Sequence, residues 1–496
     1  MTHPVLFALL VLPVATALAC RWLGQPKQRD RFHVAGSCAT ALAGWTLAAA
    51  VFSDGQPVLA AGEFLAVDAL SAYMVTLVVT IALLAGLHSP AYLRNDVAHG
   101  GLPEARTAEY YLWFHLFVAT MLLVVTVNNL GLLWAALEAT TVVSAMLGGF
   151  YQTKPALEAA WKYLMLCSVG IVIALFGVLL TYYAASVSGA ETVSLNWTDL
   201  RVVAAQLDPR YMKLALVFVV IGFGTKAGFA PLHAWLPDAH SQAPSPVSAI
   251  LSGVLLSCAL YAILRFIAIG APSVGPGLPK TLMIGFGLAS VAIAVPFLLV
   301  QRDIKRLLAY SSVEHIGLSA LAIGIGGPLG LYAGLLHLLN HALVKAFLFL
   351  LTGAIVQRYG TRRIAGIRGL LATAPITGTL LMVGALGITG MPPLSMFVSE
   401  FGIVVAGIEQ AMWPAVAAVV VLLAVSFVAV LNPALQMVLG GGPKERFPVD
   451  SSRLQQLALL LPLGGMGLMG LVVPAPVTRA LDLAVTQLLS MAGPGW

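Results

Sequence analysis

The chain has 496 residues, of which 59% are hydrophobic and only 9% are charged. A soluble protein carries about 25% charged residues, so this composition excludes an ordinary soluble domain. The net charge of +6 does not indicate nucleic-acid binding, because the basic residues follow a membrane topology. The four cysteines form no Cys-x-x-Cys pair, which argues against a disulfide framework and against an iron–sulfur site.

Long uncharged runs such as 281–300, 412–440 and 455–474 indicate membrane-spanning helices, since about 20 helical residues cross ~30 Å of hydrocarbon. The runs do not alternate in polarity, which excludes the strands of a barrel. The sequence therefore predicts an all-α integral membrane protein with about 14 transmembrane helices. The expected spans lie near 4–22, 32–52, 66–88, 110–127, 129–150, 160–185, 212–235, 246–268, 278–300, 306–326, 329–357, 372–408, 411–440 and 455–474.

The orientation follows from the basic residues. The first apolar run begins at Pro4 without a preceding basic residue, so we interpret it as a retained span and not as a cleaved signal. Most of the 26 Lys and Arg residues fall in alternate loops on one side. Cytoplasmic loops are enriched in these residues, which places both termini on the periplasmic side of a bacterial inner (cytoplasmic) membrane.

Two expected spans are interrupted by prolines. The seventh contains Pro231 and Pro237, and the twelfth contains the run 390–393, Gly-Met-Pro-Pro. Proline breaks a helix, and broken helices at membrane depth occur where they are buried or line a cavity. Interrupted spans in corresponding places are typical of inverted-repeat transporters, although each proline alone could make an ordinary kink. We expect two five-helix repeats, spans 4–8 and 9–13. The corresponding regions are an N-terminal three-helix region (1–109), a first repeat (110–270), a second repeat (271–440) and a C-terminal helix and tail (441–496).

Ionisable side chains within spans cost about 2.5–3.5 kcal/mol each and are functional candidates. Glu138 lies in the middle of the fifth span without a basic partner on its own helix, so it must pair across helices or be protonated. Lys226 precedes the first break among small and apolar residues, where desolvation favours the neutral amine. Movement of Glu138 toward or away from Lys226 could switch the protonation of this lysine. The alternatives are a neutral packing residue and a static ion pair.

A polar stripe is predicted on the eleventh span. His337, His341 and Lys345 are spaced i, i+4 and i+8, so they share one helix face and suit a water-linked proton relay. Structural histidines and a haem site are alternatives, but no second helix offers a matching haem ligand. Glu400 follows the second break and is either a terminal carboxylate of the relay or an interfacial residue.

Other polar residues are secondary candidates. Lys162 lies near the start of the sixth span and can extend to the cytoplasmic surface. His315, with Glu314, lies deeper in the tenth span. His233, Asp238 and His240 could connect the site to a water-filled vestibule. We interpret Asp68 as a helix N-cap, and Asp303, Lys305 and Arg306 as topological charges at a helix start. No phosphate loop, HExxH motif or nucleophile elbow is present, so we expect no cofactor and no metal.

One long segment carries a specific likeness. The run Gly222-Phe-Gly-Thr-Lys-Ala-Gly-Phe-Ala-Pro-Leu-His-Ala-Trp-Leu-Pro-Asp-Ala-His-Ser-Gln-Ala-Pro-Ser-Pro-Val247 resembles the hallmark of the antiporter-like subunits of respiratory complex I, membrane-bound hydrogenases and multisubunit cation/proton antiporters. The resemblance covers roughly spans 4 to 13, and segments 158–171 and 303–317 look most like component F of hydrogenase-4. It implies two inverted repeats and proton transfer along a central hydrophilic axis.

The resemblance also implies roles for individual residues. Glu138 matches the fifth-helix glutamate of the family and Lys226 its broken-helix lysine. His337, His341 and Lys345 match the eleventh-helix stripe, and Glu400 matches the terminal residue of the twelfth helix. Many members have a lysine in the eighth helix, where this chain has Ser257. The link from Lys226 to the histidines would then depend on water.

The resulting hypothesis is a non-catalytic, proton-translocating subunit of a complex I-like or group 4 hydrogenase-like oxidoreductase complex. Its expected partners are other membrane and peripheral subunits and the lipid bilayer, without nucleic acid. A cation/proton antiporter or proton-driven inorganic-carbon uptake module without a redox partner is an alternative, and so is an inactive scaffold. We expect only a short tail after the last span.

Overall fold

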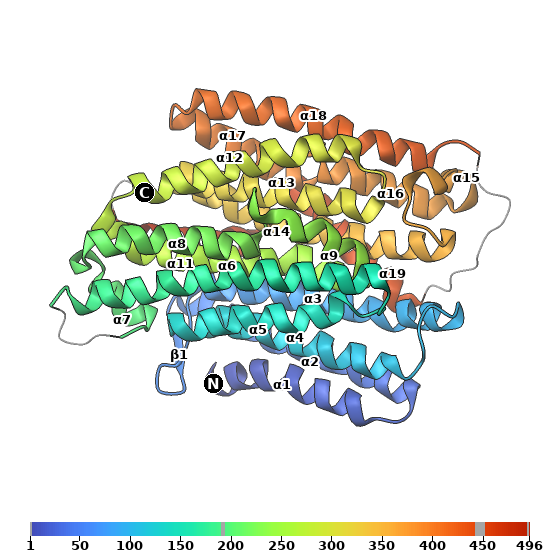
Figure 1. Cartoon of the computed structure of the whole chain (residues 1–496), viewed down its shortest axis with the longest axis horizontal. Coiled ribbons are helices and arrows are strands. Elements are labelled where there is room, and N and C mark those ends of the chain that lie inside the picture. The colour runs from blue at the N-terminus through green and yellow to red at the C-terminus, as the bar shows by residue number, and fades with distance from the viewer. Residues whose placement is uncertain (1, 190–193, 442–451, 494–495) are drawn as a thin grey trace.

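The computed structural model describes residues 2–189, 194–441, 452–493 and 496. Its helices run side by side along the long axis, and both chain termini lie at the same end of the bundle (Figure 1). Within these ranges, 13 helices are long and apolar enough to cross a membrane. The expected all-α, multi-pass architecture is confirmed. Part of the predicted C-terminal region, residues 442–451, lies outside the described residues.

The N-terminal region consists of three long helices and a small hairpin. Its elements are α1 (Thr2–Trp22), α2 (Pro26–Asp54), β1 (Val58–Ala60), β2 (Leu65–Val67) and α3 (Ala69–Ala98). The strands pair antiparallel, with Val58 opposite Val67. Helix α2 begins earlier than predicted, since Pro26 occupies its first turn, where the missing N–H costs nothing. Asp68 caps α3 as expected by accepting a 2.8 Å hydrogen bond from the Ser71 amide.

The predicted first repeat begins with three uninterrupted helices and continues through the broken seventh span. Its elements are α4 (Arg106–Thr126), α5 (Leu130–Gly148), α6 (Lys154–Ser186), α7 (Trp197–Val202), η1 (Ala204–Gln206), α8 (Pro209–Ala227), η2 (Leu232–Trp235), α9 (Leu236–Gln242), α10 (Ser245–Ile250), η3 (Leu251–Leu255) and α11 (Leu256–Val274). Gly228 caps the end of α8, and its φ of +83° is a left-handed conformation that glycine adopts without strain. The eighth span is helical throughout, but its η3 segment is a π-helix.

The predicted second repeat contains the other break. Its elements are α12 (Gly277–Val300), α13 (Ile304–Ile325), α14 (Gly327–Tyr359), η4 (Ile364–Gly366), α15 (Leu370–Thr373), α16 (Pro375–Ile388), α17 (Ser395–Glu409) and α18 (Trp413–Val438). Helices α16 and α17 have 14 and 15 residues, and at 1.5 Å per residue neither alone crosses ~30 Å. Together they account for the twelfth of the predicted spans. Gly390, with a φ of +68°, lies between them.

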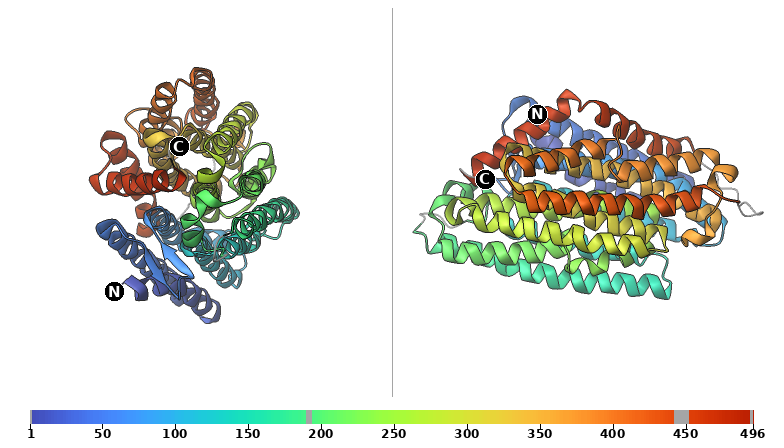
Figure 2. Two further views of the ribbon diagram at one scale, coloured as in Figure 1. Left: turned by 90° about the vertical axis from the view of Figure 1, so that its left-hand side faces the viewer. Right: turned by 90° about the horizontal axis from the view of Figure 1, so that it is seen from above.

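The chain continues through α19 (Arg453–Leu471) into a helix that the sequence reasoning treated as a tail, α20 (Ala475–Ala492). Its buried residues include Leu481, Val485 and Leu488, which recur every three or four positions and form one apolar face. This face packs on α3, α11 and α14. The C-terminus and the N-terminus lie near the same end in Figure 2.

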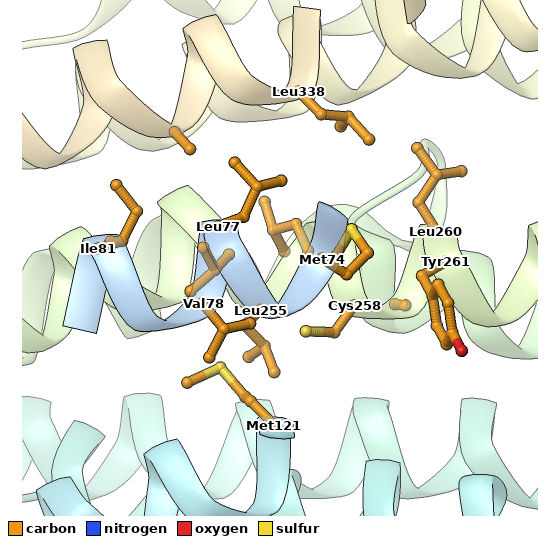
Figure 3. Close-up of a cluster of buried hydrophobic side chains, with 14 of the residues drawn as sticks. Met74, Leu77, Val78, Ile81, Met121, Leu255, Cys258, Leu260, Tyr261 and Leu338 are labelled. Atoms are coloured by element: carbon orange, nitrogen blue, oxygen red, sulfur yellow. The ribbon is translucent and has the colours of Figure 1, made fainter. Parts of the chain in front are cut away.

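The core joins the N-terminal region to both halves of the chain. Most residues of helices α3, α11, α13 and α14 are buried, whereas fewer than half of those of α6, α12 and α18 are buried. Figure 3 shows Met74 and Val78 of α3 packed with Met121 of α4 and Leu255 of η3, while Leu338 of α14 approaches from the other side. The centrally placed helices therefore hold the polar residues away from lipid.

Candidate functional site

The polar residues of the interior form a row across the central helices. Most members have less than 3% of their surface exposed. They are Lys226, His240, Ser257, Glu314, His315, His337, His341 and Lys345. Glu400 is 8% exposed and His233 is 7% exposed.

Lys226 lies in the last turn of α8, directly before the first break. Its Nζ donates hydrogen bonds to Thr141 Oγ1 at 2.8 Å and to Tyr163 Oη at 2.6 Å. Tyr163 Oη is also 2.6 Å from Ser144 Oγ. The lysine is therefore held by hydroxyl groups of α5 and α6.

Glu138 is one helical turn before Thr141 on α5, so it approaches the lysine from the same face. Its Oε1 accepts a 2.7 Å hydrogen bond from Ser168 Oγ. Its Oε2 is buried and has no hydrogen-bond partner among the described residues. The expected Glu138–Lys226 pair is thus adjacent but not in direct contact, because hydroxyl groups occupy the amine. The sequence reasoning missed Thr141 and Tyr163. Thr141 lies three residues after Glu138 and Tyr163 directly follows Lys162, so both lie close to residues that had been singled out.

Two secondary candidates lie at the surface of the bundle. Lys162 has half of its side chain exposed and forms ion pairs with Glu158 at 2.8 Å and Asp238 at 3.3 Å. Asp238 also pairs with Arg306 at 2.5 Å. Lys162 therefore extends to the surface of the bundle. Asp238 forms ion pairs with two partly exposed cations, Lys162 and Arg306. His233 packs edge-on against Tyr310, with ring centroids 6.1 Å apart.

The connection between the two predicted repeats differs from the expected one at Ser257. Within the described ranges, the Ser257 hydroxyl has one hydrogen bond, which goes to Gly253 O of the same span at 3.5 Å. Ser252, in the π-helical turn, places its Oγ 2.7 Å from Ser312 Oγ of α13. A π-helical turn rotates the side chains that follow it and is frequent at functional sites. The hydroxyl bridge to the second half therefore lies at Ser252.

Lys345 meets this bridge at one backbone carbonyl. Its Nζ donates to Leu308 O at 2.7 Å and to Ser311 Oγ, and Ser312 Oγ donates to the same Leu308 O at 3.0 Å. Lys345 shares one face of α14 with His341 and His337, as the spacing predicted. Both ring nitrogens of His341 are buried without a hydrogen-bond partner in the described structure, and so are both nitrogens of His240. Buried ring nitrogens are nearly always hydrogen-bonded, so we expect ordered water beside these rings.

The start of α13 contains a lysine whose burial the sequence reasoning did not anticipate. Asp303 caps the helix by accepting hydrogen bonds from the amides of Lys305 and Arg306 at 2.8 and 3.1 Å. Lys305 is not a surface charge, because it is buried and donates to Ala243 O at 2.5 Å. The polar row thus reaches one end of the bundle through Lys305 and His240.

A network of four side chains lies beside the second break. His315 Nδ1 is 3.2 Å from His337 Nε2, and His337 Nδ1 is 3.0 Å from Ser399 Oγ. The Ser399 hydroxyl donates to Met396 O at 3.0 Å and accepts from Asn340 Nδ2 at 3.1 Å. When the hydroxyl hydrogen points to Met396 O, Ser399 accepts from His337 Nδ1–H, and His337 Nε2 then accepts from His315 Nδ1–H. This arrangement gives the histidine pair a direction from His315 toward Ser399.

Glu400 completes the network from α17. Its Oε1 is 3.9 Å from His315 Nδ1 and has no hydrogen bond in the described structure. Gly390 faces this carboxylate so closely that a side chain there would collide with it. The glycine of the second break thus makes room for the carboxylate. Glu314, on α13, accepts a 2.8 Å hydrogen bond from Ser426 of α18.

Two broken helices and a buried row of lysine, histidine and glutamate between them define an antiporter-like membrane subunit. Residues 127–426 match the model of the family described as NADH:quinone oxidoreductase/Mrp antiporter, transmembrane. The chain belongs to this family, and the resemblance inferred from 222–247 is confirmed.

Relatives and solved structures agree with this assignment. The chain is 41% identical over 341 residues to a hydrogenase-4 component F homolog of Methylacidiphilum infernorum, which covers 68% of this chain and 72% of that protein. It is 31% identical to NADH-quinone oxidoreductase subunit N of Desulforudis audaxviator over 88% of this chain and 87% of that protein.

Among solved structures, a chain of the archaeal membrane-bound sulfane sulfur reductase has a TM-score of 0.86 at 26% identity, with 98% of this chain and 99% of that one covered. A chain of respiratory complex I from Thermus thermophilus has a TM-score of 0.76 at 26% identity, with 98% of this chain and 100% of that one covered.

Proposed function

We propose that this chain is a proton-translocating membrane subunit of a multisubunit, hydrogenase-4-like or complex I-like oxidoreductase complex. Its partner subunits carry out the redox chemistry. The proposal is supported by the names of the relatives. The observation that supports it most is the set of buried titratable groups that begins with Lys226 at the first break and ends with Glu400 at the second. A purely structural role would not require so many ionisable groups at membrane depth, since each is costly there.

The proposed route begins at the Glu138–Lys226 pair. Loss of the hydroxyl contacts to Thr141 and Tyr163 would free the amine to move toward the carboxylate, which stabilises its charged form. We propose that water joins this region to the Ser252–Ser312 bridge, which reaches Lys345 through Leu308 O. Water beside His341 links Lys345 to the histidine pair.

The final step uses the direction of the histidine network. A neutral imidazole can accept a proton on one nitrogen and release another from the opposite nitrogen. His315 and His337 are hydrogen-bonded, and His315 Nδ1 also lies 3.9 Å from Glu400. Glu400 is therefore proposed as the terminal carboxylate, and Lys305 with His240 as the cytoplasmic connection. Moving one charge against 100 mV costs about 2.3 kcal/mol, which the partner subunits must supply.

The membrane placement belongs to the same proposal. The basic loops favour the bacterial inner membrane with both termini on the periplasmic side. The regions 110–270 and 271–440 are proposed as the two inverted repeats, since each contains one break after a left-handed glycine.

The test compares Lys226→Ala with Lys162→Ala in inverted membrane vesicles that contain the whole complex. Substrate-driven acidification should be lost in the first variant and kept in the second, because Lys162 lies at the surface. Unchanged acidification with Lys226→Ala would refute the proposal. Identification of co-purifying subunits, with measurement of their iron–sulfur content, separates the oxidoreductase assembly from an antiporter without a redox partner.

A further inference from the structure

Three side chains from three helices converge beside the second break: His315 of α13, His337 of α14 and Glu400 of α17. Each offers one ligand atom, and the three atoms lie within 4.8 Å of one another. We propose that this cluster binds a divalent transition-metal ion of the zinc type, and that the bound ion blocks proton transfer. The binding stands on the geometry alone, whereas the block rests on the proposed function.

The ligand set and its distances suit zinc. Zinc is bound by imidazole nitrogen and carboxylate oxygen at about 2.0–2.2 Å, and tetrahedral geometry then separates the ligand atoms by ~3.3 Å. The His315 and His337 nitrogens are 3.2 Å apart. His315 Nδ1 and Glu400 Oε1 are 3.9 Å apart, so a small rotation of the carboxylate closes the site. Two imidazoles and one carboxylate leave the fourth position to water.

The surroundings orient these ligands. Metal-binding histidines almost always donate their second ring N–H to a neighbouring acceptor, which fixes the ring. His337 does this through Nδ1 to Ser399, which is itself held by Asn340. Glu400 Oε1 is buried and makes no hydrogen bond within the described part of the chain, so it is free to ligate. Gly390 leaves space for the carboxylate on its other side.

The depth of the cluster explains why an ion there would block transport. His315 is ten residues before the end of α13 and His337 ten residues after the start of α14, or ~15 Å from that end of the bundle. This is about half of the ~30 Å hydrocarbon thickness. An ion must therefore arrive along the polar route itself. Once bound, it occupies the lone pairs of His315 Nδ1 and His337 Nε2, and the hydrogen on Nδ1 moves to the other ring nitrogen or leaves.

The binding test uses the purified complex with the full chain. The complex is stripped with a chelator and then loaded with Zn²⁺ alone or with Co²⁺, whose tetrahedral complexes absorb visible light. Wild type should bind Zn²⁺ at this site and show the cobalt bands. His337→Asn and Glu400→Gln should bind roughly tenfold more weakly or worse and lose the bands. The control is His88→Asn, which removes an equally buried histidine from α3 and should bind as wild type does.

The outcomes separate binding from function. The spectra are compared in preparations in which Glu400→Gln assembles with its partner subunits as wild type does. Equal cobalt spectra in the two proteins would refute the metal site. Zn²⁺ that binds to wild type but leaves proton transport unchanged would overturn the block. A Lys226→Ala variant with normal transport would refute the proposed function while the Zn²⁺ titration still reported on the cluster.

Discussion

Arg265 of α11 forms a buried two-point ion pair with Asp68, the residue that caps α3. Nη1 lies 2.5 Å from Oδ2, and Nη2 contacts Oδ1 and also donates to Ser71 Oγ at 2.9 Å. Gln487 of α20 donates to the same carboxylate. The indole ring of Trp197 covers the guanidinium, with 4.2 Å between the guanidinium carbon and the ring centroid. One carboxylate thus joins the N-terminal region, the eighth span and the C-terminal helix.

Removal of either charge of this pair should destabilise the protein strongly. A buried ion pair that loses one partner leaves an uncompensated charge, which costs about 3–5 kcal/mol. We expect Arg265→Met and Asp68→Asn each to lower the thermal unfolding temperature of the purified protein. The double variant should recover part of the loss, because neither charge is then left unpaired. A double variant with the sum of the two single losses would contradict this interpretation.

The same pair predicts a dependence of stability on pH. Burial alone would raise the pKa of Asp68, but Arg265 and the surrounding hydrogen bonds hold it below the ordinary value of 3.8. A lowered folded-state pKa means that the contribution is complete above the unfolded-state pKa and is lost as the pH falls through the folded-state pKa. The measurement is the thermal unfolding temperature between about pH 6 and pH 3, which lie on either side of the ordinary pKa. As the pH falls, this temperature should fall more steeply in wild type than in the double variant.

The two serines of the eighth span distinguish the bridge seen in the structure from the one expected from the family pattern. Ser252→Ala removes the hydroxyl that contacts Ser312 and should slow proton transport about tenfold, since one missing link adds roughly 1.4 kcal/mol to the barrier. Ser257→Ala removes an equally buried hydroxyl, whose one hydrogen bond to a described residue stays within its own span, and should leave the rate unchanged. Initial rates in reconstituted vesicles are the measurement. Slow transport in Ser257→Ala with a normal Ser252→Ala would place the bridge at Ser257 instead.

Glu400 can be tested against an acid of the same helix. Glu400→Gln keeps the shape of the side chain but cannot carry a proton, so we expect a loss of transport of at least tenfold with normal assembly. Glu409→Gln changes an exposed carboxyl at the end of α17 and should transport as wild type does. The argument for a terminal carboxylate fails if the two variants have equal rates.

Gly390 should be sensitive for a reason beyond its backbone conformation. Alanine at this position would strain the left-handed φ of +68° and also push against the Glu400 carboxylate. Gly360 has a φ of +64° but open space around it, so Gly360→Ala carries the strain without the collision. We expect both variants to lose about 1 kcal/mol of stability, while only Gly390→Ala also loses transport. Equal transport in the two variants would show that the carboxylate has room to move.

The sequence was informative where a feature is local. The spans and the two breaks follow from hydropathy and proline, and the stripe from His337 to Lys345 follows from helical spacing. The amphipathic α20 was missed because its apolar positions are too few to resemble a span. The burial of Lys305 was missed because a charge at a helix start usually faces water. The Ser252–Ser312 bridge depends on a π-helical turn and on which faces of α11 and α13 meet, and serine leaves no mark in hydropathy.

In the second half of the chain, the buried lysines and the buried glutamates lie at different depths along the helices. Lys345 bonds to Leu308, four residues after the start of α13, about 6 Å along the helix. Glu314 and Glu400 lie nearer the middle of the bundle, and Lys345 and Lys305 lie closer than they do to the end where α13 begins. A proton that passes between these groups crosses only part of the membrane field. The energy of this step is therefore a fraction of the ~2.3 kcal/mol that one charge needs to cross the full membrane at 100 mV. The occupancy of Glu400 should therefore follow an imposed diffusion potential, so that the relay also acts as a voltage-dependent element.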